Sequence, residues 1–335
     1  MSENKSIETY RSRLNWIDEL RGFGILMVVM GHCLPPFNKY IYGFHMPLFF
    51  MISGYIYNDD NTTFALFIKK LLKRYIKPYF ILCLINLFLC FVFYKFNVYD
   101  KFNLFKFVFG IVWSIGTTEW MPNCSPLWYL TAIFCSLTLF WAIHKVRGIK
   151  IRITILLSMI MFCFLGELED FPKLIWNIDS AMMGVIFVEF GYILRKENII
   201  EKISNQISFK TFIVIGWGGG IGIHFNNVNS VSFDGARYGN ILLMILGATC
   251  FSVLMFVFIY ANHENPNFRL LYSYLGYLGK NTITIIGFDY MTGSLIRVVL
   301  QKLEFLNWMA QFIGRMVLLT VVIIFLNHLK NKKLL

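Results

Sequence analysis

Long apolar segments follow one another along most of the chain, separated by short polar stretches. Most of them contain close to 20 residues, the length that an α-helix needs to cross about 30 Å of hydrocarbon. The pattern predicts an all-α polytopic integral membrane protein with about ten transmembrane helices. The predicted helices cover residues 15–36, 40–57, 76–96, 124–144, 151–166, 174–194, 211–225, 239–261, 278–299 and 308–328.

One further apolar segment, residues 103–116, is too short to cross the membrane comfortably, so we expect it to lie at the outer interface or to re-enter. No long linker, low-complexity segment or soluble appendage interrupts the pattern. Residues 1–335 are therefore expected to form a single integral membrane domain. The polar residues before the first apolar segment argue against a cleavable signal peptide.

Composition and charge agree with this class. Of the 335 residues, 57% are hydrophobic and only 15% are charged, against about 25% charged residues in a typical soluble domain. The net charge is +12, but the basic residues gather in alternate loops, as the positive-inside rule describes. The excess charge therefore indicates contact with membrane lipids and a topology with both termini in the cytoplasm, and it does not indicate a nucleic-acid partner.

The first two predicted helices form a hairpin with few polar residues. Arg21 and His32 are eleven residues apart, so they share one face of the first helix, about 16 Å apart along its axis. Asp18, three residues before Arg21, lies on the same face and can pair with it. His45 begins the second helix at nearly the depth of His32. Because a histidine can take a proton from a hydroxyl near neutral pH, these four are candidate catalytic residues, with His32 as the general base.

Each of these residues also has a purely structural interpretation. A single intramembrane histidine is often only a hydrogen-bond partner, and His45 can serve to support His32. Arg21 can anchor the first helix at the cytoplasmic headgroups. The alignment of Arg21 with His32, and the pairing with Asp18, favour the catalytic interpretation.

A cluster of basic residues precedes the third predicted helix. Lys70, Lys73, Arg74 and Lys77 recur at spacings of three and four, which places them on one face of a helix on the cytoplasmic side. By composition alone they form a face whose long side chains reach the lipid headgroups. Arg74 is the strongest candidate for a specific role, because Pro78 marks the predicted helix start just after it.

On the outer side, Ser125 and Trp128 open the fourth predicted helix and Asp179 opens the sixth. Aromatic residues at an interface are commonly only belt residues, whereas an acid inside an apolar segment calls for a partner or a function. A carboxylate and aromatic faces near a base suit a sugar, so all three are candidate substrate-binding residues. The other intramembrane charges, interpreted mainly as ion-pair partners of one another, are Glu189, Asp289 and Arg315.

Several short sequence motifs along the chain, taken together, resemble those of one protein family. They are WIDELRG (16–22) with His32 eleven residues after Arg21, FHMPLFFMISGY (44–55), RYIKP (74–78), SPLWYLTAIF (125–134) and LGKNT (278–282). Together they resemble the acyltransferase-3 family of bacterial membrane O-acyltransferases. Within it, IDSAMMGVIFVEFGYIL (178–194) and the LGKNT stretch look most like the fucose 4-O-acetylase-like subgroup. Members often carry a histidine eight residues after the Asn of that last motif, and Asp289 stands there in this chain.

The resemblance implies an acyltransferase of a bacterial cytoplasmic membrane. It implies that an acyl group, most simply acetyl, passes from cytoplasmic acetyl-CoA to a sugar hydroxyl of a surface glycan or lipid-linked saccharide, and that Arg21 and His32 are both needed. In that setting the basic face with Lys70, Lys73, Arg74 and Lys77 suits the phosphates of coenzyme A.

A different function class fits the same features less well. In a secondary transporter the intramembrane charges would line a translocation path, but the sequence has no clear internal repeat and no matching pair of broken helices. It also has no Walker loop, dinucleotide fingerprint, nucleophile elbow or zinc-type spacing of Cys and His. We therefore expect acetyl-CoA as the acyl donor and no metal.

Overall fold

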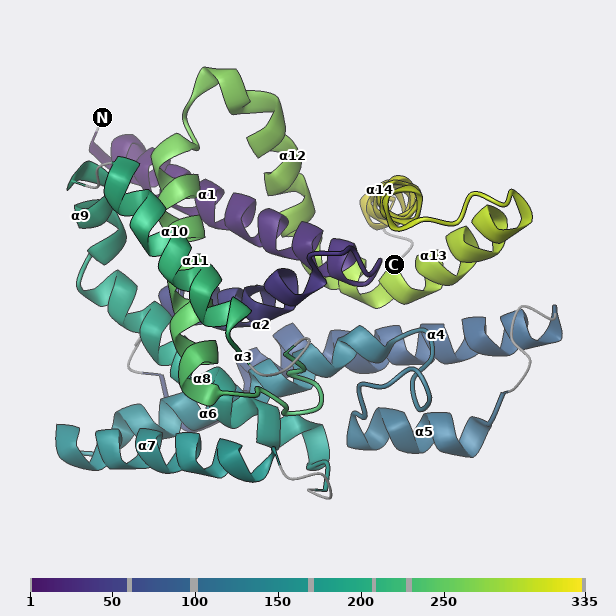
Figure 1. Cartoon of the computed structure of the whole chain (residues 1–335), viewed down its shortest axis with the longest axis horizontal. Coiled ribbons are helices and arrows are strands. Elements are labelled where there is room, and N and C mark those ends of the chain that lie inside the picture. Colours follow the sequence, from purple (N-terminus) through teal and green to yellow (C-terminus); the bar gives the residue numbers. More distant parts are fainter. Residues whose placement is uncertain are drawn as a thin grey trace.

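The computed structural model describes residues 2–58, 62–96, 102–167, 172–206, 209–226 and 231–332. Across those ranges the chain is almost entirely helical (Figure 1), and its only β-type pairing is an isolated bridge between Ser232 and Arg237. The predicted all-α fold class is confirmed.

The helices follow the order of the predicted segments. The first half contains α1 (Ser2–Gly31), α2 (Asn38–Tyr55), α3 (Phe64–Leu71), the π-helical turn η1 (Leu72–Ile76), α4 (Lys77–Lys95), α5 (Leu104–Trp113), the 3₁₀ turn η2 (Ser125–Leu127) and α6 (Trp128–Lys145). The second half contains α7 (Ile149–Leu165), η3 (Ile175–Asn177), α8 (Ile178–Lys196), α9 (Ile199–Gln206), α10 (Phe209–His224), α11 (Ile241–Asn262), η4 (Pro266–Phe268), α12 (Arg269–Lys280), α13 (Thr282–Lys302) and α14 (Trp308–Asn331).

Six helical segments within the described ranges are long and apolar enough to cross a membrane, so the chain is a multi-pass membrane protein. They contain α3–η1–α4, η2–α6, η3–α8, α11, α13 and α14. The four other predicted spans coincide with α1, α2, α7 and α10. The short segment expected at the interface forms α5, a helix of 10 residues.

The third predicted span, 76–96, matches α4, which begins at Lys77 with Pro78 in its first turn. Helical structure also precedes it, since α3 and η1 continue directly into α4 and one helical segment runs from Phe64 to Lys95 with the basic residues on it. Proline has no N–H to donate to the carbonyl of Arg74, four residues before it, and the wider π-helical turn η1 lies where that bond is missing.

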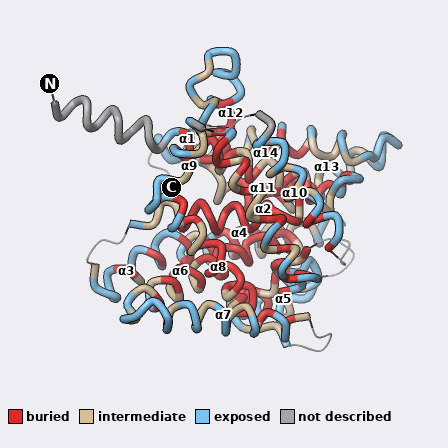
Figure 2. Tube along the Cα trace, turned by 60° about the vertical axis from the view of Figure 1, so that its left-hand side comes forward, coloured by how far each residue is buried: buried red, intermediate tan, exposed pale blue. Residues whose placement is uncertain are grey.

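Burial separates a central layer of helices from a lipid-facing one. The most apolar window of η2–α6 is 72% buried within the protein, whereas that of α14 is only 22% buried. Figure 2 shows buried residues running through the middle of the bundle and exposed residues along its outer helices. Large apolar side chains are exposed there, among them Leu84, Phe88, Val317 and Phe325. Hydrocarbon is the medium in which such a surface is stable.

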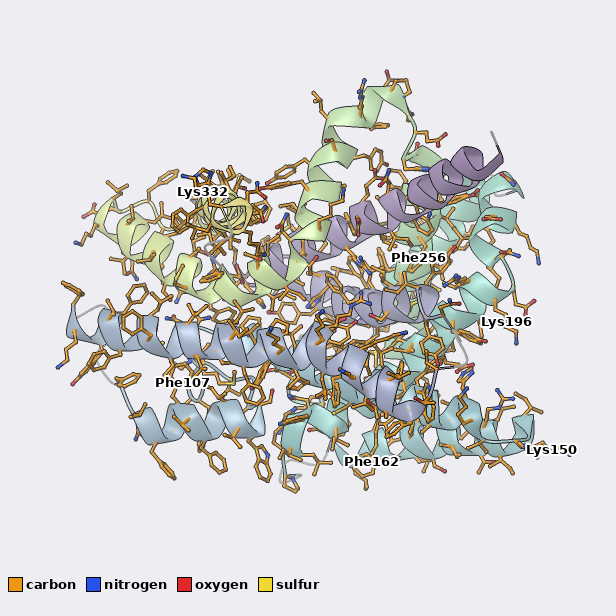
Figure 3. All side chains as sticks on the ribbon, turned by 180° about the vertical axis from the view of Figure 1, so that it is seen from behind. Phe107, Lys150, Phe162, Lys196, Phe256 and Lys332 are labelled. Carbon is orange, nitrogen blue, oxygen red and sulfur yellow. The ribbon has the colours of Figure 1, made fainter. Side chains whose placement is uncertain are left out.

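The helix axes run in several directions. In Figure 1, α4 and α7 run across the view while α14 is seen end-on. Figure 3 places Lys150, at the start of α7, and Lys196, at the end of α8, at the same end of the molecule, as the predicted topology requires of two cytoplasmic residues. Lys332, just after α14, lies away from that end in the same view.

Two glycines let α12 cross α1 at very short range and so fix the helix that carries Arg21. A Cβ on Gly22 would lie 1.8 Å from the carbonyl oxygen of Leu275, and one on Gly279 would lie 1.7 Å from that of Asp18. No larger side chain fits at either position. This small-residue contact is a typical way for membrane helices to pack closely.

Candidate active site

Helix α1 carries both residues of the predicted Arg–His pair on one uninterrupted element. The helical hydrogen bonding extends to His32, whose N–H donates to the carbonyl of Val28 at 3.1 Å. Continuous helical bonding therefore joins Arg21 to His32, which places the two residues about 16 Å apart along the helix axis, as predicted. The predicted pairing is also present, since Arg21 Nη1 lies 2.9 Å from Asp18 Oδ1.

His32 forms a short bond that sequence reasoning missed. Its Nδ1 lies 2.6 Å from Oδ2 of Asp289, a residue of α13 with no exposed side-chain surface. Because a carboxylate can only accept, Nδ1 carries the hydrogen and the unprotonated Nε2 is left to act as a base. The geometry matches the arrangement by which an acid orients a catalytic histidine.

Arg315 of α14 lies on the other side of Asp289, which places the carboxylate between two partners. Its Nη1 is 3.5 Å from Asp289 Oδ1, and the side chain is buried. The guanidinium reaches this position because α13 has a glycine there: a Cβ on Gly293 would lie 2.4 Å from Arg315 Cζ. The predicted ion pair between intramembrane charges is confirmed for Asp289 and Arg315.

The remaining intramembrane acid pairs elsewhere. Oε2 of Glu189 lies 2.8 Å from Nε2 of His144, which joins α8 to the end of α6. The expectation that Glu189 pairs with Asp289 or Arg315 is therefore wrong. The actual partner is a histidine that sequence reasoning had left out.

His45 is buried in α2, and its Nδ1 donates to the carbonyl of Ile41 at 2.8 Å. A carbonyl oxygen can only accept, so His45 also has its unprotonated nitrogen at Nε2. Both histidines line one cavity of about 80 Å³, several times the roughly 10–15 Å³ that one water requires. The two differ in what lies behind the ring, which is a carboxylate for His32 and a neutral carbonyl for His45. Only His32 has its ring oriented by a carboxylate, the arrangement found behind catalytic histidines.

The cavity brings the predicted histidines together with two of the three predicted substrate residues. Ser125 and Trp128, at the start of α6, lie in its wall. The hydroxyl of Ser125 donates to the carbonyl of Gly116, which ties the loop before α6 to the cavity. The tyrosines in the wall, which sequence reasoning did not select, are Tyr42, Tyr129 and Tyr290.

Asp179, the third predicted substrate residue, is not part of this cavity wall. Its Oδ2 lies 3.2 Å from Nζ of Lys173, and the carboxylate is 3% exposed. Burial lowers the pKa of the Lys173 ammonium below its ordinary value, and the nearby Asp179 carboxylate opposes that shift. The side chain of Asp179 is directed toward a loop lysine and not into the cavity. Its observed interaction is structural.

The acid that does line the cavity is Asp234, in the outer loop before α11. The main chain at this point is held by two bonds: Ser180 Oγ donates to the carbonyl of Phe233, and Lys173 Nζ donates to that of Asp234. Lys173 and Asp179 therefore contribute to the cavity indirectly, by fixing the loop above it. The only sequence signal for this loop is the turn-forming Asp234-Gly235 pair.

The four basic residues assigned to donor binding are all exposed on the helical segment α3–η1–α4. Arg74 lies in the π-helical turn, 5.3 Å from the centre of the Tyr75 ring. The turn packs against α6, whose Tyr129 lines the cavity that holds His32.

The match to known proteins decides the family. The acyltransferase-3 family model, described as an acyltransferase domain, matches residues 14–328. The chain belongs to this family. No curated protein and no solved structure matches it.

As a membrane acyltransferase of this family, the protein has to bring an acyl donor and a nucleophile together. The matched region contains every residue of the cavity and both arginines. In the described part of the chain, no group of three or more His, Cys, Asp or Glu side chains is arranged to hold a metal ion.

Proposed function

We propose that this acyltransferase moves an acetyl group from cytoplasmic acetyl-CoA to a sugar hydroxyl held in the outer cavity. The observation that carries the proposal is the environment of His32. Its Nδ1 is fixed by Asp289 at 2.6 Å while the ring lines the cavity. A histidine oriented in this way is suited to taking a proton from a hydroxyl.

The proposed chemistry is a direct transfer. The acceptor hydroxyl gives its proton to Nε2 of His32, and its oxygen attacks the thioester carbonyl of the donor. The Asp289 carboxylate stabilises the imidazolium that forms. When the C–S bond breaks, the thiolate of coenzyme A leaves and takes the proton from His32, which returns the base to its starting state. His45, whose Nε2 is also unprotonated, orients the acceptor hydroxyl.

The donor is proposed to enter from the end of the protein where Arg21 lies. Asp18 holds Arg21 at 2.9 Å, and the exposed face with Lys70, Lys73, Arg74 and Lys77 supplies positive charge for phosphate groups. An extended pantetheine arm suits the roughly 16 Å between Arg21 and His32 along α1.

The acceptor is proposed to be a surface glycan or a lipid-linked saccharide. Sugars have polar edges and apolar faces, and the cavity offers both kinds of contact through Ser125 and the rings of Trp128, Tyr42 and Tyr290. Assignment to the fucose 4-O-acetylase-like subgroup rests on the likeness of residues 178–194 and 278–282. We place the protein in a bacterial cytoplasmic membrane, with its N-terminus in the cytoplasm.

Incubation of membranes with radiolabelled acetyl-CoA tests the proposal. Membranes that contain the protein should accumulate alkali-labile acetyl groups on glycan, and matched membranes that contain the His32→Ala variant should not. Mass spectrometry of surface glycans from cells with and without the gene gives the same comparison in vivo. A transporter would leave no covalent acetyl on glycan, so that result would contradict the proposed function.

Replacing Arg21 with lysine should reduce acetyl transfer strongly although the positive charge is kept. A planar guanidinium can hold Asp18 and a phosphate or carboxylate oxygen at the same time, and an ammonium lacks that geometry. The rate of transfer in membranes measures the effect, and Lys330→Arg at the end of α14 serves as the control. Near-normal activity of Arg21→Lys would show that Arg21 only anchors the helix.

Single cysteines should report which ends of α2 face outward and inward. Leu34 is 69% exposed in the turn between α1 and α2, and Asn58 is exposed shortly after α2. In a background without the native cysteines, an impermeant thiol reagent added to whole cells should label Leu34→Cys and spare Asn58→Cys. Permeabilised cells should show labelling at both positions. The reverse pattern in whole cells would overturn the path from cytoplasmic donor to outward-facing acceptor.

A further inference from the structure

One carboxylate lines the cavity together with its two histidines. Among the described residues of the wall, Asp234 is the only acid, and there is no lysine or arginine. Residues 227–230, which precede Val231 of the wall in the sequence, are all uncharged. The other nearby acid, Asp289, faces Arg315. An acceptor that enters the cavity therefore meets the negative charge of Asp234 with no lysine or arginine in the described wall.

The position of that charge is fixed by the surrounding loop. The hydroxyl of Ser232 donates to Asp234 Oδ1 at 2.8 Å, and the Ser232–Arg237 bridge closes the turn with bonds of 2.8 and 2.9 Å. Lys173 is bound to the main-chain carbonyl of Asp234, and its ammonium pairs with Asp179. Among the described residues, no lysine or arginine forms an ion pair with the Asp234 carboxylate. Tyr42 and Tyr290 line the same cavity as Asp234.

From this arrangement we infer that the acceptor is a neutral or amino-bearing saccharide, and that Asp234 excludes saccharides that carry a carboxylate or a phosphate. The hydroxyls of a neutral sugar can donate to Asp234, and an ammonium group can pair with it. An anionic sugar would place a second negative charge beside Asp234, and no lysine or arginine in the described cavity wall is available to pair with it, since Lys173 already pairs with Asp179. Like charges brought together oppose binding. The inference rests on the proposed role of the cavity as the acceptor site.

A binding measurement tests the inference without requiring turnover. Diethyl pyrocarbonate modifies neutral imidazole nitrogens, so a ligand in the cavity should protect His32 and His45 from modification. The folded protein is labelled in the membrane and then digested, and mass spectrometry of the peptides measures the modification of each histidine. Three probes share one ring and differ in charge: methyl glucoside, methyl glucosaminide and methyl glucuronide. The glucuronide should need at least about tenfold more ligand than the glucoside for half-protection. The glucosaminide should protect at least as well as the glucoside.

Two variants assign the discrimination to Asp234. Asp234→Asn keeps an oxygen for the Ser232 hydroxyl and removes the charge, so the glucoside and the glucuronide should then differ by less than about threefold. Glu119→Gln, at an outer acid that is 72% exposed and paired with Lys106, should leave the wild-type ratio unchanged. Equal protection by the glucoside and the glucuronide in the wild type, an unchanged ratio in Asp234→Asn, or no protection by any probe would overturn the inference.

The same probes separate this inference from the proposed function. Protection with the expected order, but without radiolabelled acetyl on any glycoside or glycan, would contradict acetyl transfer and leave the inferred acceptor class intact. Acetylation of endogenous glycan without protection by any probe would support the transfer reaction and overturn the acceptor class.

Discussion

Replacing His32 with alanine should lower acetyl transfer by about 10²–10⁴-fold, the usual loss when a general base is removed. The ring lines the cavity and is oriented by Asp289, so the variant loses the group that accepts the hydroxyl proton. The variant should still insert and accumulate, because His32 lies just past the last residue of α1 and its replacement leaves the long apolar helices unchanged. Transfer of radiolabelled acetyl, normalised to the amount of protein in the membrane, is the measurement.

Two matched histidine variants make the result specific. His328→Ala, at an exposed position near the end of α14, should retain the wild-type rate. His45→Ala should lose less activity than His32→Ala, since only His32 has a carboxylate behind its ring. A His32→Ala rate within a few-fold of wild type would remove His32 from the mechanism.

Replacing Asp289 with asparagine should lower kcat by about 10²–10⁴-fold and leave the KM for acetyl-CoA nearly unchanged. The substitution removes the charge that stabilises the His32 imidazolium, and an amide can donate to Nδ1, which would move the histidine hydrogen to the nitrogen that must act as base. The proposed donor site around Arg21 is far from this point, so donor binding should not change. Initial rates over a range of donor concentrations separate the two parameters.

The same substitution leaves Arg315 as a buried cation with no counter-charge, which destabilises a protein by about 3–5 kcal/mol. Loss of activity could then come from loss of folded protein. The double variant Asp289→Asn with Arg315→Met removes this uncompensated charge, so it should accumulate normally and remain as slow as the single variant. Recovery of the wild-type kcat in the double variant would show that Asp289 has only a structural role.

The features that the sequence determined by itself depend on neighbours along the chain. Hydropathy over about 20 residues located the helices, and the 100° turn per residue placed Asp18, Arg21 and His32 on one face of α1, where the structure has them. The likeness of several short stretches to the acyltransferase-3 family was also readable, and the family match confirms it. The third predicted span matches α4, with Pro78 in its first turn, but the sequence did not show that the π-helical turn η1 joins α4 to α3 in one continuous helical segment.

Tertiary structure alone decided which side chains meet. Asp289 is 257 residues from His32 and reaches it because α13 packs against α1. Asp179 and Asp234 show the same dependence: the first was expected in the cavity and is directed toward Lys173, and the second was not selected and lines the cavity wall. Helical periodicity gives the depth and the face of a residue on its own helix. The partner it faces depends on how helices distant in the sequence pack together, and that packing determines which acid orients His32 and which acid meets the acceptor.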